Sequence, residues 1–416
     1  MPIISIKYGD TTLQLDAPSS LQVINPPILD LPPVNTANAF LSALNSADLT
    51  LKNYLAGGKN LLIIVPDRTR KCSMNLFLPQ LLNTISAYGY NPANIQFLIA
   101  NGAHTPVNPE IYRSLLGGNI IHSCRILQHD CDSPAVFLGY TSRGTPVEIN
   151  PLIMQFERVL VIGGSLPHYF AVYGGGPKMI LPGCSSRRSI THNHRLSLNL
   201  DPEWKPGSDS GSIEDNPVIQ DIIEAVALLP TIYYCGLILS SDELPRRFFA
   251  GEIISTYRKL TSEADKLFCV TRSELADLVI VSPGGRPKDL DLLQTHKSMF
   301  HASAALKTGG VMILFAQCPD GLGSNNLETL IQLGEYNHII NRLSQEYIIN
   351  GQAAVSLMQM GKKFSVKMMT VLDDKILKTL NFAPTNLKEV QNLLPESADK
   401  SLYFFPAAAM TRFKLR

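Results

Sequence analysis

The 416-residue sequence has no excess of charge of either sign and no long hydrophobic run. Its 36 lysines and arginines are balanced by 35 aspartates and glutamates, so no overall positive field would attract nucleic acid or an anionic membrane. No apolar run approaches the roughly 20 residues that a helix needs to cross a bilayer. We therefore expect neither nucleic acid nor a membrane as a partner, and we expect any anionic ligand to occupy a local site.

Closely spaced cysteines are also missing. The seven cysteines form no CxxC pair, a spacing typical of single reduced thiols rather than of a disulfide framework or a zinc site. The opening segment, MPIISIKYGD, has neither the basic nor the apolar region of a secretion signal. Together these absences predict a cytoplasmic location.

Standard nucleotide-binding motifs are absent as well. Gly174, Gly175 and Gly176 precede Lys178, but Pro177 interrupts the Gly-Lys step, so the phosphate-loop pattern fails. No GxGxxG follows the first apolar strand, which argues against a standard Rossmann dehydrogenase. The three glycines could serve only a tight turn, or they could let the backbone approach a flat ligand beside the Lys178 amine, a potential nucleophile.

What the sequence does contain is a series of short, continuous apolar runs separated by segments of helical spacing. Continuous rather than alternating apolar strands are typical of a parallel sheet covered on both faces. The sequence therefore predicts an α/β fold with mainly parallel sheets. The runs lie at 61–65 (LLIIV), 95–100 (IQFLIA), 159–163 (VLVIG), 230–240, 278–282 (LVIVS) and 311–316 (VMILFA).

The chain is long enough for two domains. Apolar residues at core spacing over 248–274 predict one long helix that crosses between two α/β lobes. We place an N-terminal lobe at 1–270 and a C-terminal lobe at 275–385, with an active-site crevice between them. The final segment, 388–416, is expected to form an edge strand and to return to complete the first lobe.

Four of the predicted strands are followed directly by a base or a cation. Ligands of open α/β sheets bind beyond the carboxyl ends of the strands, so this coincidence favours a site there. Taken singly, each group has an ordinary explanation, such as a loop histidine with a satisfied hydrogen bond or a helix cap with a solvated arginine. The groups are Asp67–Arg70, Asn101–Thr105, Pro167–His168 with Tyr173–Lys178, and Gly284–Asp289.

Two later segments carry further candidates. Ser185 and Ser186, followed by two arginines, could hold a phosphate at a helix N-terminus or simply cap a surface helix. His192 and His194 come next, and on a helix they point to different faces, so a single imidazole could ligate a transition metal. In the second lobe, a predicted helix over 289–307 places an amide, an ammonium and an imidazole on one stripe, which could bind a carboxylate or be plain solvated surface. These are Gln294, Lys297 and His301.

These motifs, taken together and in order, resemble the lactate racemase family that uses a nickel-pincer nucleotide. The block from Leu166 to Gly183, followed by His194, is the most specific part. The resemblance runs from about residue 61 to 300. Its other parts are Asp67–Arg70, Gly102–His104, His129–Asp132, Pro287–Asp289, Gln294 and Lys297.

The resemblance implies a cofactor and a reaction. By position, Lys178 would be tethered to a pyridinium-3,5-bisthiocarboxylic acid mononucleotide that holds nickel, and His194 would be the histidine ligand of the metal. The first lobe would hold this cofactor, with the glycines at 174–176, Asp67 and Thr69 beside it. The reaction would remove hydride from C2 of a 2-hydroxy acid and return it to the other face, which makes the enzyme an isomerase. The enzymes that synthesise the cofactor would be its partners.

The same resemblance assigns the acid–base and substrate groups. His104 and His168 would flank the substrate and exchange the hydroxyl proton, as imidazoles that titrate near neutrality can. Arg70, Gln294 and Lys297 would hold its carboxylate. The family pattern has arginine at Pro177 and tyrosine at Leu293, so we expect a 2-hydroxy acid other than lactate, with its C3 substituent near Leu293.

Two alternatives remain from the sequence. One is an epimerase of a longer sugar acid or dicarboxylate with the same cofactor. The other is a non-catalytic nucleotide-binding protein of the same fold, against which the presence of both His104 and His168 beside Lys178 argues. The sequence assigns no role to His192 or His301.

Overall fold

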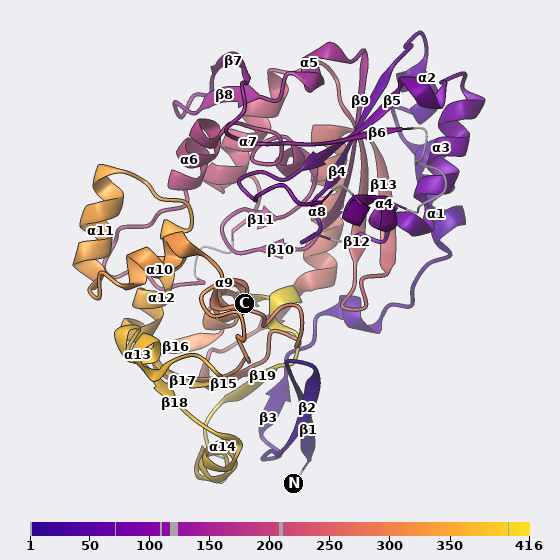
Figure 1. Cartoon of the computed structure of the whole chain (residues 1–416). Helices are drawn as coiled ribbons and strands as arrows, with labels where there is room; N and C mark the ends of the chain where they lie inside the picture. Colours follow the sequence, from indigo (N-terminus) through magenta and orange to yellow (C-terminus); the bar gives the residue numbers. More distant parts are fainter. Residues whose placement is uncertain (1, 71, 109, 117–123, 208–210, 398) are drawn as a thin grey trace.

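Two six-stranded sheets organise the molecule (Figure 1). The structure is a computed structural model, and it describes residues 2–70, 72–108, 110–116, 124–207, 211–397 and 399–416. None of the helices within these ranges combines the length and the apolar character that a bilayer crossing requires. The predicted class, α/β with mainly parallel sheets, is confirmed.

The first sheet contains four of the predicted apolar runs. Its strands are parallel except for the antiparallel pair β13 and β12 at one edge. The run LLIIV forms one of the two central strands and is buried along its whole length. In order, the strands are β13 (Pro245–Glu252), β12 (Tyr233–Leu239), β9 (Arg158–Ser165), β4 (Leu61–Pro66), β5 (Ile95–Ala100) and β6 (Arg125–Gln128).

Helices cover both faces of this sheet, which explains why its strand β4 is apolar at every position. Leu61 and Ile63 point into a core with α1 (Thr36–Ser46), α2 (Leu51–Leu55), α3 (Leu78–Ala87) and α4 (Glu110–Leu116). Leu62 and Ile64 point into the opposite core, with α5 (Leu152–Gln155), α6 (Arg187–Arg195), α7 (Pro217–Ala227) and α8 (Ile253–Phe268). A hairpin of β7 (Val136–Tyr140) and β8 (Pro146–Ile149) lies outside the sheet.

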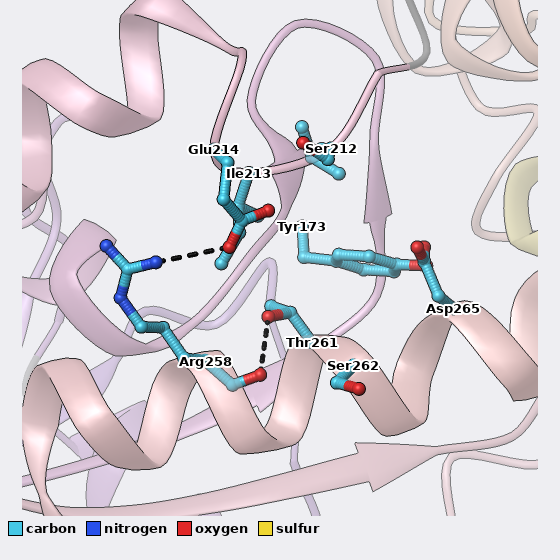
Figure 2. Close-up of a pocket in the computed structure, with 9 residues that line it drawn as sticks. Tyr173, Ser212, Ile213, Glu214, Arg258, Thr261, Ser262 and Asp265 are labelled. Carbon is cyan, nitrogen blue, oxygen red and sulfur yellow. Dashed lines mark hydrogen bonds and ion pairs between the residues drawn. The ribbon is translucent and has the colours of Figure 1, made fainter.

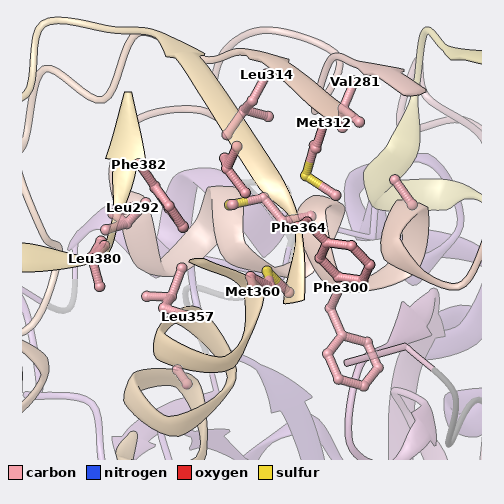
Figure 3. Close-up of a cluster of buried hydrophobic side chains, with 14 of the residues drawn as sticks. Val281, Leu292, Phe300, Met312, Leu314, Leu357, Met360, Phe364, Leu380 and Phe382 are labelled. Carbon is pink, nitrogen blue, oxygen red and sulfur yellow. The ribbon is translucent and has the colours of Figure 1, made fainter. Parts of the chain in front are cut away.

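The second sheet is parallel throughout and is also covered on both faces. Figure 3 shows one of its cores, where Phe300 and Met360 pack beside Met312 and Leu314. The other face packs on the hairpin β1 (Ile3–Tyr8) and β2 (Thr11–Asp16) and on α14 (Leu387–Leu393). The strand order is β18 (Phe382–Pro384), β17 (Ser365–Met369), β16 (Leu306–Phe315), β15 (Ala276–Val281), β19 (Leu402–Phe405) and β3 (Leu21–Val23).

The helices of this second core come from the C-terminal half of the chain. They are α9 (Leu292–Ser303), α10 (Asn325–Ile331), α11 (Tyr336–Gln345), α12 (Gly351–Lys363) and α13 (Asp374–Thr379). The Asp291 carboxylate caps α9 by accepting a hydrogen bond from the Gln294 amide (2.7 Å), so the helix begins later than predicted. This cap fixes the start of the helix that carries Lys297.

The single long helix predicted over 248–274 is wrong. Residues 245–252 form strand β13, in which Phe248 pairs with Leu237. The chain becomes helical only at Ile253, because the Glu252 carboxylate caps α8 by accepting hydrogen bonds from the backbone amides of Ile254 and Ser255. Helix α8 ends at Phe268. The apolar residues of 248–252 therefore pack in a strand, although their spacing is also compatible with a helix.

The pairing of the chain ends also differs from the prediction. Strand β19 is not an edge strand and does not return to the first sheet, because it lies between β15 and β3 of the second. Beyond β19, Met410 packs in a core of the first sheet, and β20 (Arg412–Leu415) pairs with β14 (Cys269–Arg272) while Arg412 binds Asp265 of α8. Strand β3, from the segment assigned to the first lobe, belongs to the second sheet. The lobe boundaries at 270 and 275 stay a prediction.

Candidate active site

A short hairpin after β9 places His168 in an aromatic environment. Strands β10 (Pro167–His168) and β11 (Val172–Tyr173) pair antiparallel, and His168 is only 7% exposed. Its imidazole stacks on the Tyr169 ring, with centroids 5.4 Å apart and planes 9° from parallel. The Phe170 ring meets it edge-on at 4.4 Å. Its Nδ1 is buried and has no hydrogen-bond partner in the described part of the chain.

The glycine segment that follows requires glycine on steric grounds. Gly175 and Gly176 have φ angles of 74° and 53°, in the left-handed region that side chains disfavour. A Cβ on Gly176 would lie 2.4 Å from Cδ2 of Tyr257. The tight turn lets the chain continue into a short 3₁₀ helix, η5 (Gly176–Met179), which buries Lys178.

Lys178 is a buried cation without a carboxylate partner among the described residues. Its Nζ lies 4.8 Å from the centre of the Phe170 ring. Burial, together with the charges of Arg70 and Lys297, holds the pKa of this ammonium well below its ordinary value. A lysine that is easily deprotonated is suited to act as a nucleophile.

His194 lies near the end of α6, the helix that the Ser186 side chain caps. Its ring is 5.0 Å from Phe170, so Phe170 contacts His168, Lys178 and His194 alike. Burial, Lys178 and Arg70 lower its pKa to about 3, which keeps the imidazole neutral. Its Nδ1 is buried and lacks a partner among the described residues, whereas His192 is exposed.

His104 and Asp67 form a hydrogen-bonded pair at the ends of β5 and β4. His104 Nδ1 lies 2.6 Å from Asp67 Oδ2, and the side chains are 60% and 5% exposed. Asp67 Oδ1 accepts hydrogen bonds from the Thr69 amide (3.1 Å) and hydroxyl (2.8 Å). Burial opposes ionisation of Asp67, but the bonds from His104 and Thr69 and the charges of His104 and Arg70 outweigh it and lower its pKa. Asp67 and Thr69 thus orient His104, a contact that the sequence did not predict.

Helix α9 brings the second lobe to the site. Lys297 Nζ donates to Gln294 Oε1 at 2.6 Å. Burial and the charge of Arg70 lower the Lys297 pKa to about 8, although Asp291 and Asp67 act against them. Leu293 is partly buried and packs on the second core. His301 does not share a solvated stripe with them, because its side chain is buried beside Phe300.

The charges therefore come from both lobes and have mainly one sign. Arg70 and Lys297 each lower the pKa of Lys178, and all three act on His168, whose pKa burial already lowers well below its ordinary value. An anion beside these cations would relieve their mutual repulsion. The expected crevice between the lobes stays a prediction.

A separate hollow of about 220 Å³ lies between α8, β11 and residues 212–214 (Figure 2). Tyr173, Arg258 and Asp265 line it, and Arg258 pairs with Glu214 at 3.1 Å. Tyr173 is the one member of the predicted strand-end groups that lines this hollow, and neither Lys178 nor the candidate histidines line it. Asp265 also accepts a hydrogen bond from the Tyr173 hydroxyl at 2.6 Å, which anchors the start of the glycine segment.

The segment His129–Asp132 has a structural arrangement. The His129 Nε2 donates to the Ser185 carbonyl at 2.9 Å, and its Nδ1 lies 3.1 Å from the Asn150 amide nitrogen. Asp130, Cys131 and Asp132 could offer donor atoms to a metal, but Asp132 is already engaged by two 2.6 Å bonds from Arg187. His129 thus ties the end of the first sheet to the segment that leads into α6.

Comparison with known proteins identifies the family. The family model for the lactate racemase N-terminal domain matches residues 8–205, and that for the C-terminal domain matches residues 271–392. Lactate racemases of Thermoanaerobacterium thermosaccharolyticum and Lactiplantibacillus plantarum are 30% and 28% identical to the chain over 275 residues. These alignments cover 66% of this chain and 63% of each relative.

Two solved structures agree with this comparison. The lactate racemase apoprotein of Thermoanaerobacterium thermosaccharolyticum has a TM-score of 0.89 and 25% identity, with 99% of this chain and 100% of that chain covered. A Thermotoga maritima protein, at 16% identity and a TM-score of 0.72, covers 92% of this chain and 99% of its own, and supports the fold alone. Both domain models match in order, and the fold extends over nearly the whole chain. The chain therefore belongs to the lactate racemase family.

Proposed function

We propose that this protein is an isomerase that racemises or epimerises a 2-hydroxy acid with a nickel-pincer nucleotide tethered to Lys178. One observation carries the proposal: two buried imidazoles, His168 and His194, have unpartnered Nδ1 atoms in the described structure, and they lie with Lys178 around Phe170. Buried polar atoms are seldom left unsatisfied unless a ligand or water completes them.

The donor set fits the proposed cofactor. A neutral imidazole is a good nickel ligand, and the His194 imidazole is neutral near pH 7 because its pKa is about 3. Lys178, with its lowered pKa, would provide the tether. Of the three glycines before it, Gly174 would leave room for a flat ring, whereas Tyr234 and Tyr257 fill the space beside Gly175 and Gly176. When bound, the cofactor would supply the acceptor for the hydride of substrate C2.

The cations around the site would bind the substrate carboxylate. Lys297 lies on α9 of the second lobe with its Nζ bonded to Gln294, and Arg70 follows β4 of the first. Both charges lower the pKa of Lys178, which supports a carboxylate site shared by the two cations beside the tether. A carboxylate held from both lobes would fix C2 in one orientation.

The two histidines would move the hydroxyl proton. His104 Nδ1 is bonded to Asp67, which leaves its Nε2 to accept or return a proton, and the carboxylate stabilises the resulting imidazolium. His168 is kept neutral by burial and by the nearby cations, so it is ready to accept the proton of the opposite enantiomer. Aromatic rings around His168 exclude water from that side.

The test is to produce the protein together with the enzymes that synthesise the cofactor. We expect a mass increase located on Lys178, bound nickel, and interconversion of the enantiomers of a 2-hydroxy acid, with lactate as the first member of a panel. Lys178→Ala should lose the mass increase, the nickel and the activity together, and Lys266→Ala, at an exposed lysine, should keep all three. Active, nickel-loaded protein with an unmodified Lys178 would contradict the assignment. Bound cofactor without turnover on any acid would instead favour a non-catalytic carrier.

A further inference from the structure

A buried hydrogen-bond chain connects the His168 hairpin to the second lobe. The Gln352 Nε2, in the first turn of α12, donates to the Tyr169 hydroxyl at 2.8 Å, across a sequence separation of 183 residues. The Oε1 of the same amide accepts a hydrogen bond from the Tyr347 hydroxyl. Gln352 is only 5% exposed, so water does not substitute for these bonds.

This chain uses both polar ends of the Gln352 amide, one as donor to Tyr169 and one as acceptor from Tyr347. Each tyrosine hydroxyl can donate or accept, so either orientation of the amide keeps both bonds. Leaving a buried partner unpaired would cost about 1–3 kcal/mol. The second lobe therefore fixes the position of the Tyr169 hydroxyl.

Two residues of α9, also in the second lobe, contact the Tyr169 ring. His296 of α9 meets it edge-on at 4.9 Å and Phe300 at 5.7 Å. The Tyr169 ring also meets Phe170 edge-on at 4.8 Å and lies nearly parallel to His168. Since no described residue bonds to His168 Nδ1, aromatic contacts rather than a polar partner orient this imidazole.

We propose that Gln352 is a positioning residue for His168, and that it acts through the ring of Tyr169. Gln352 lies on α12 of the second lobe, so the second lobe sets the plane of the His168 imidazole. That imidazole belongs to the first lobe and is the group that we assign to proton transfer. The inference rests on the proposed function for its kinetic consequence, but its structural part, the link from Gln352 to His168, is independent of any reaction.

The test compares two buried glutamines of the same helix. Gln352→Leu removes the link, whereas Gln359→Leu removes an equally buried amide that bonds instead to the carbonyls of Asp201 (3.4 Å) and Pro202 (3.3 Å). The ring current of Tyr169 displaces the ring-proton resonances of His168. We expect Gln352→Leu to move these resonances, assigned with His168→Gln, and Gln359→Leu to leave them in place.

The kinetic arm uses cofactor-loaded protein. We expect Gln352→Leu to lower kcat by about 10- to 100-fold with KM changed by less than about threefold, because misplacing a reacting group affects the chemical step most. Tyr169→Phe cuts the same link, so the double variant should be no slower than Gln352→Leu alone.

The outcomes separate the two proposals. If the His168 resonances are the same in Gln352→Leu and wild type, or if Gln359→Leu moves them equally, the positioning role is wrong. If they move as expected while loaded wild-type protein turns over no 2-hydroxy acid, the proposed function fails and the link stands. Moved resonances with unchanged kcat in an active enzyme would show that the link does not position His168 for reaction.

Discussion

The loop after β5 and the β10–β11 hairpin each carry a histidine that we assign to proton transfer, and they hold it in opposite ways. His104 is exposed and is oriented by one short bond to the buried Asp67 carboxylate. His168 is buried, is stacked on Tyr169, and has no polar partner for its Nδ1 among the described residues.

The difference shows that a histidine can be oriented either by a carboxylate or by aromatic packing, with different effects on its charge. A carboxylate fixes the imidazole tautomer and stabilises the charged form once a proton arrives. Aromatic packing fixes the plane of the ring but favours its neutral form. Because two enantiomers have the same free energy, kcat/KM must be equal in both directions of a racemisation. The asymmetry of the two bases can therefore appear only in the separate values of kcat and KM.

The strongest test of this comparison removes each histidine in turn. His104→Gln and His168→Gln should each lower kcat/KM by about 10²- to 10⁴-fold in both directions, since each abolishes one proton transfer. Nickel content should be unchanged, because neither residue is the proposed ligand. Near-wild-type racemisation in either variant would rule out a mechanism with two bases.

A smaller change tests the carboxylate that orients His104 separately from the aromatic rings that orient His168. Asp67→Asn keeps the size of the side chain but removes the charge that supports His104, and we expect a loss in kcat/KM of at least about tenfold. The variant Asp67→Asn/His104→Gln should be no slower than His104→Gln alone, because both changes act through one residue. Additive losses measured in steady-state assays would mean that Asp67 acts elsewhere.

The pH profile tests the cations that surround both histidines. Lys297, with a pKa of about 8, is charged below that pH and neutral above it, so carboxylate binding weakens as the pH rises. We expect kcat/KM to fall about tenfold per pH unit above pH 8. In Lys297→Arg the guanidinium stays charged, and this alkaline limb should disappear. An identical limb in both proteins would assign it to another group.

The smallest expected effect concerns the substrate. Wild-type protein should prefer a 2-hydroxy acid other than lactate, because Leu293 offers an apolar contact without a hydrogen bond. Leu293→Tyr should change relative kcat/KM values across a panel by about fivefold, the size of one net hydrogen bond of about 1 kcal/mol. Leu293→Met keeps an apolar side chain and serves as the control. A clear wild-type preference for lactate, or an unchanged ranking in Leu293→Tyr, would contradict this interpretation.

Local patterns in the sequence predicted much of the fold. The strand at 61–65 is recognisable because every position is apolar, which only a strand buried on both faces requires. The residues at 248–252 were mistaken for helix because their environment is set by pairing with β12, a contact that their own spacing does not encode. Local propensity does not predict the secondary structure of such a segment, because tertiary contacts determine it.

The candidate site could be proposed from the sequence where its residues follow strand ends, but not where it depends on distant contacts. Three candidate residues follow apolar runs or glycines closely, and their types at those positions predict catalytic or cofactor-binding roles. They are His104, His168 and Lys178. The Asp67–His104 bond joins two different strand ends, and the Gln352–Tyr169 bond joins two lobes. No local pattern encodes either contact, although the adjacent aromatics Tyr169 and Phe170 were a visible signal.

The position of β19 has a consequence for the order in which the chain can fold during synthesis. All strands of the first sheet lie between residues 61 and 252, so that sheet can assemble as soon as this continuous stretch leaves the ribosome. In the described structure β3 pairs only with β19, which is translated almost last. Strand β3 must therefore wait, unpaired, for nearly the entire length of translation. The second lobe, with α9 and α12, can take its final form only when the polypeptide is almost complete.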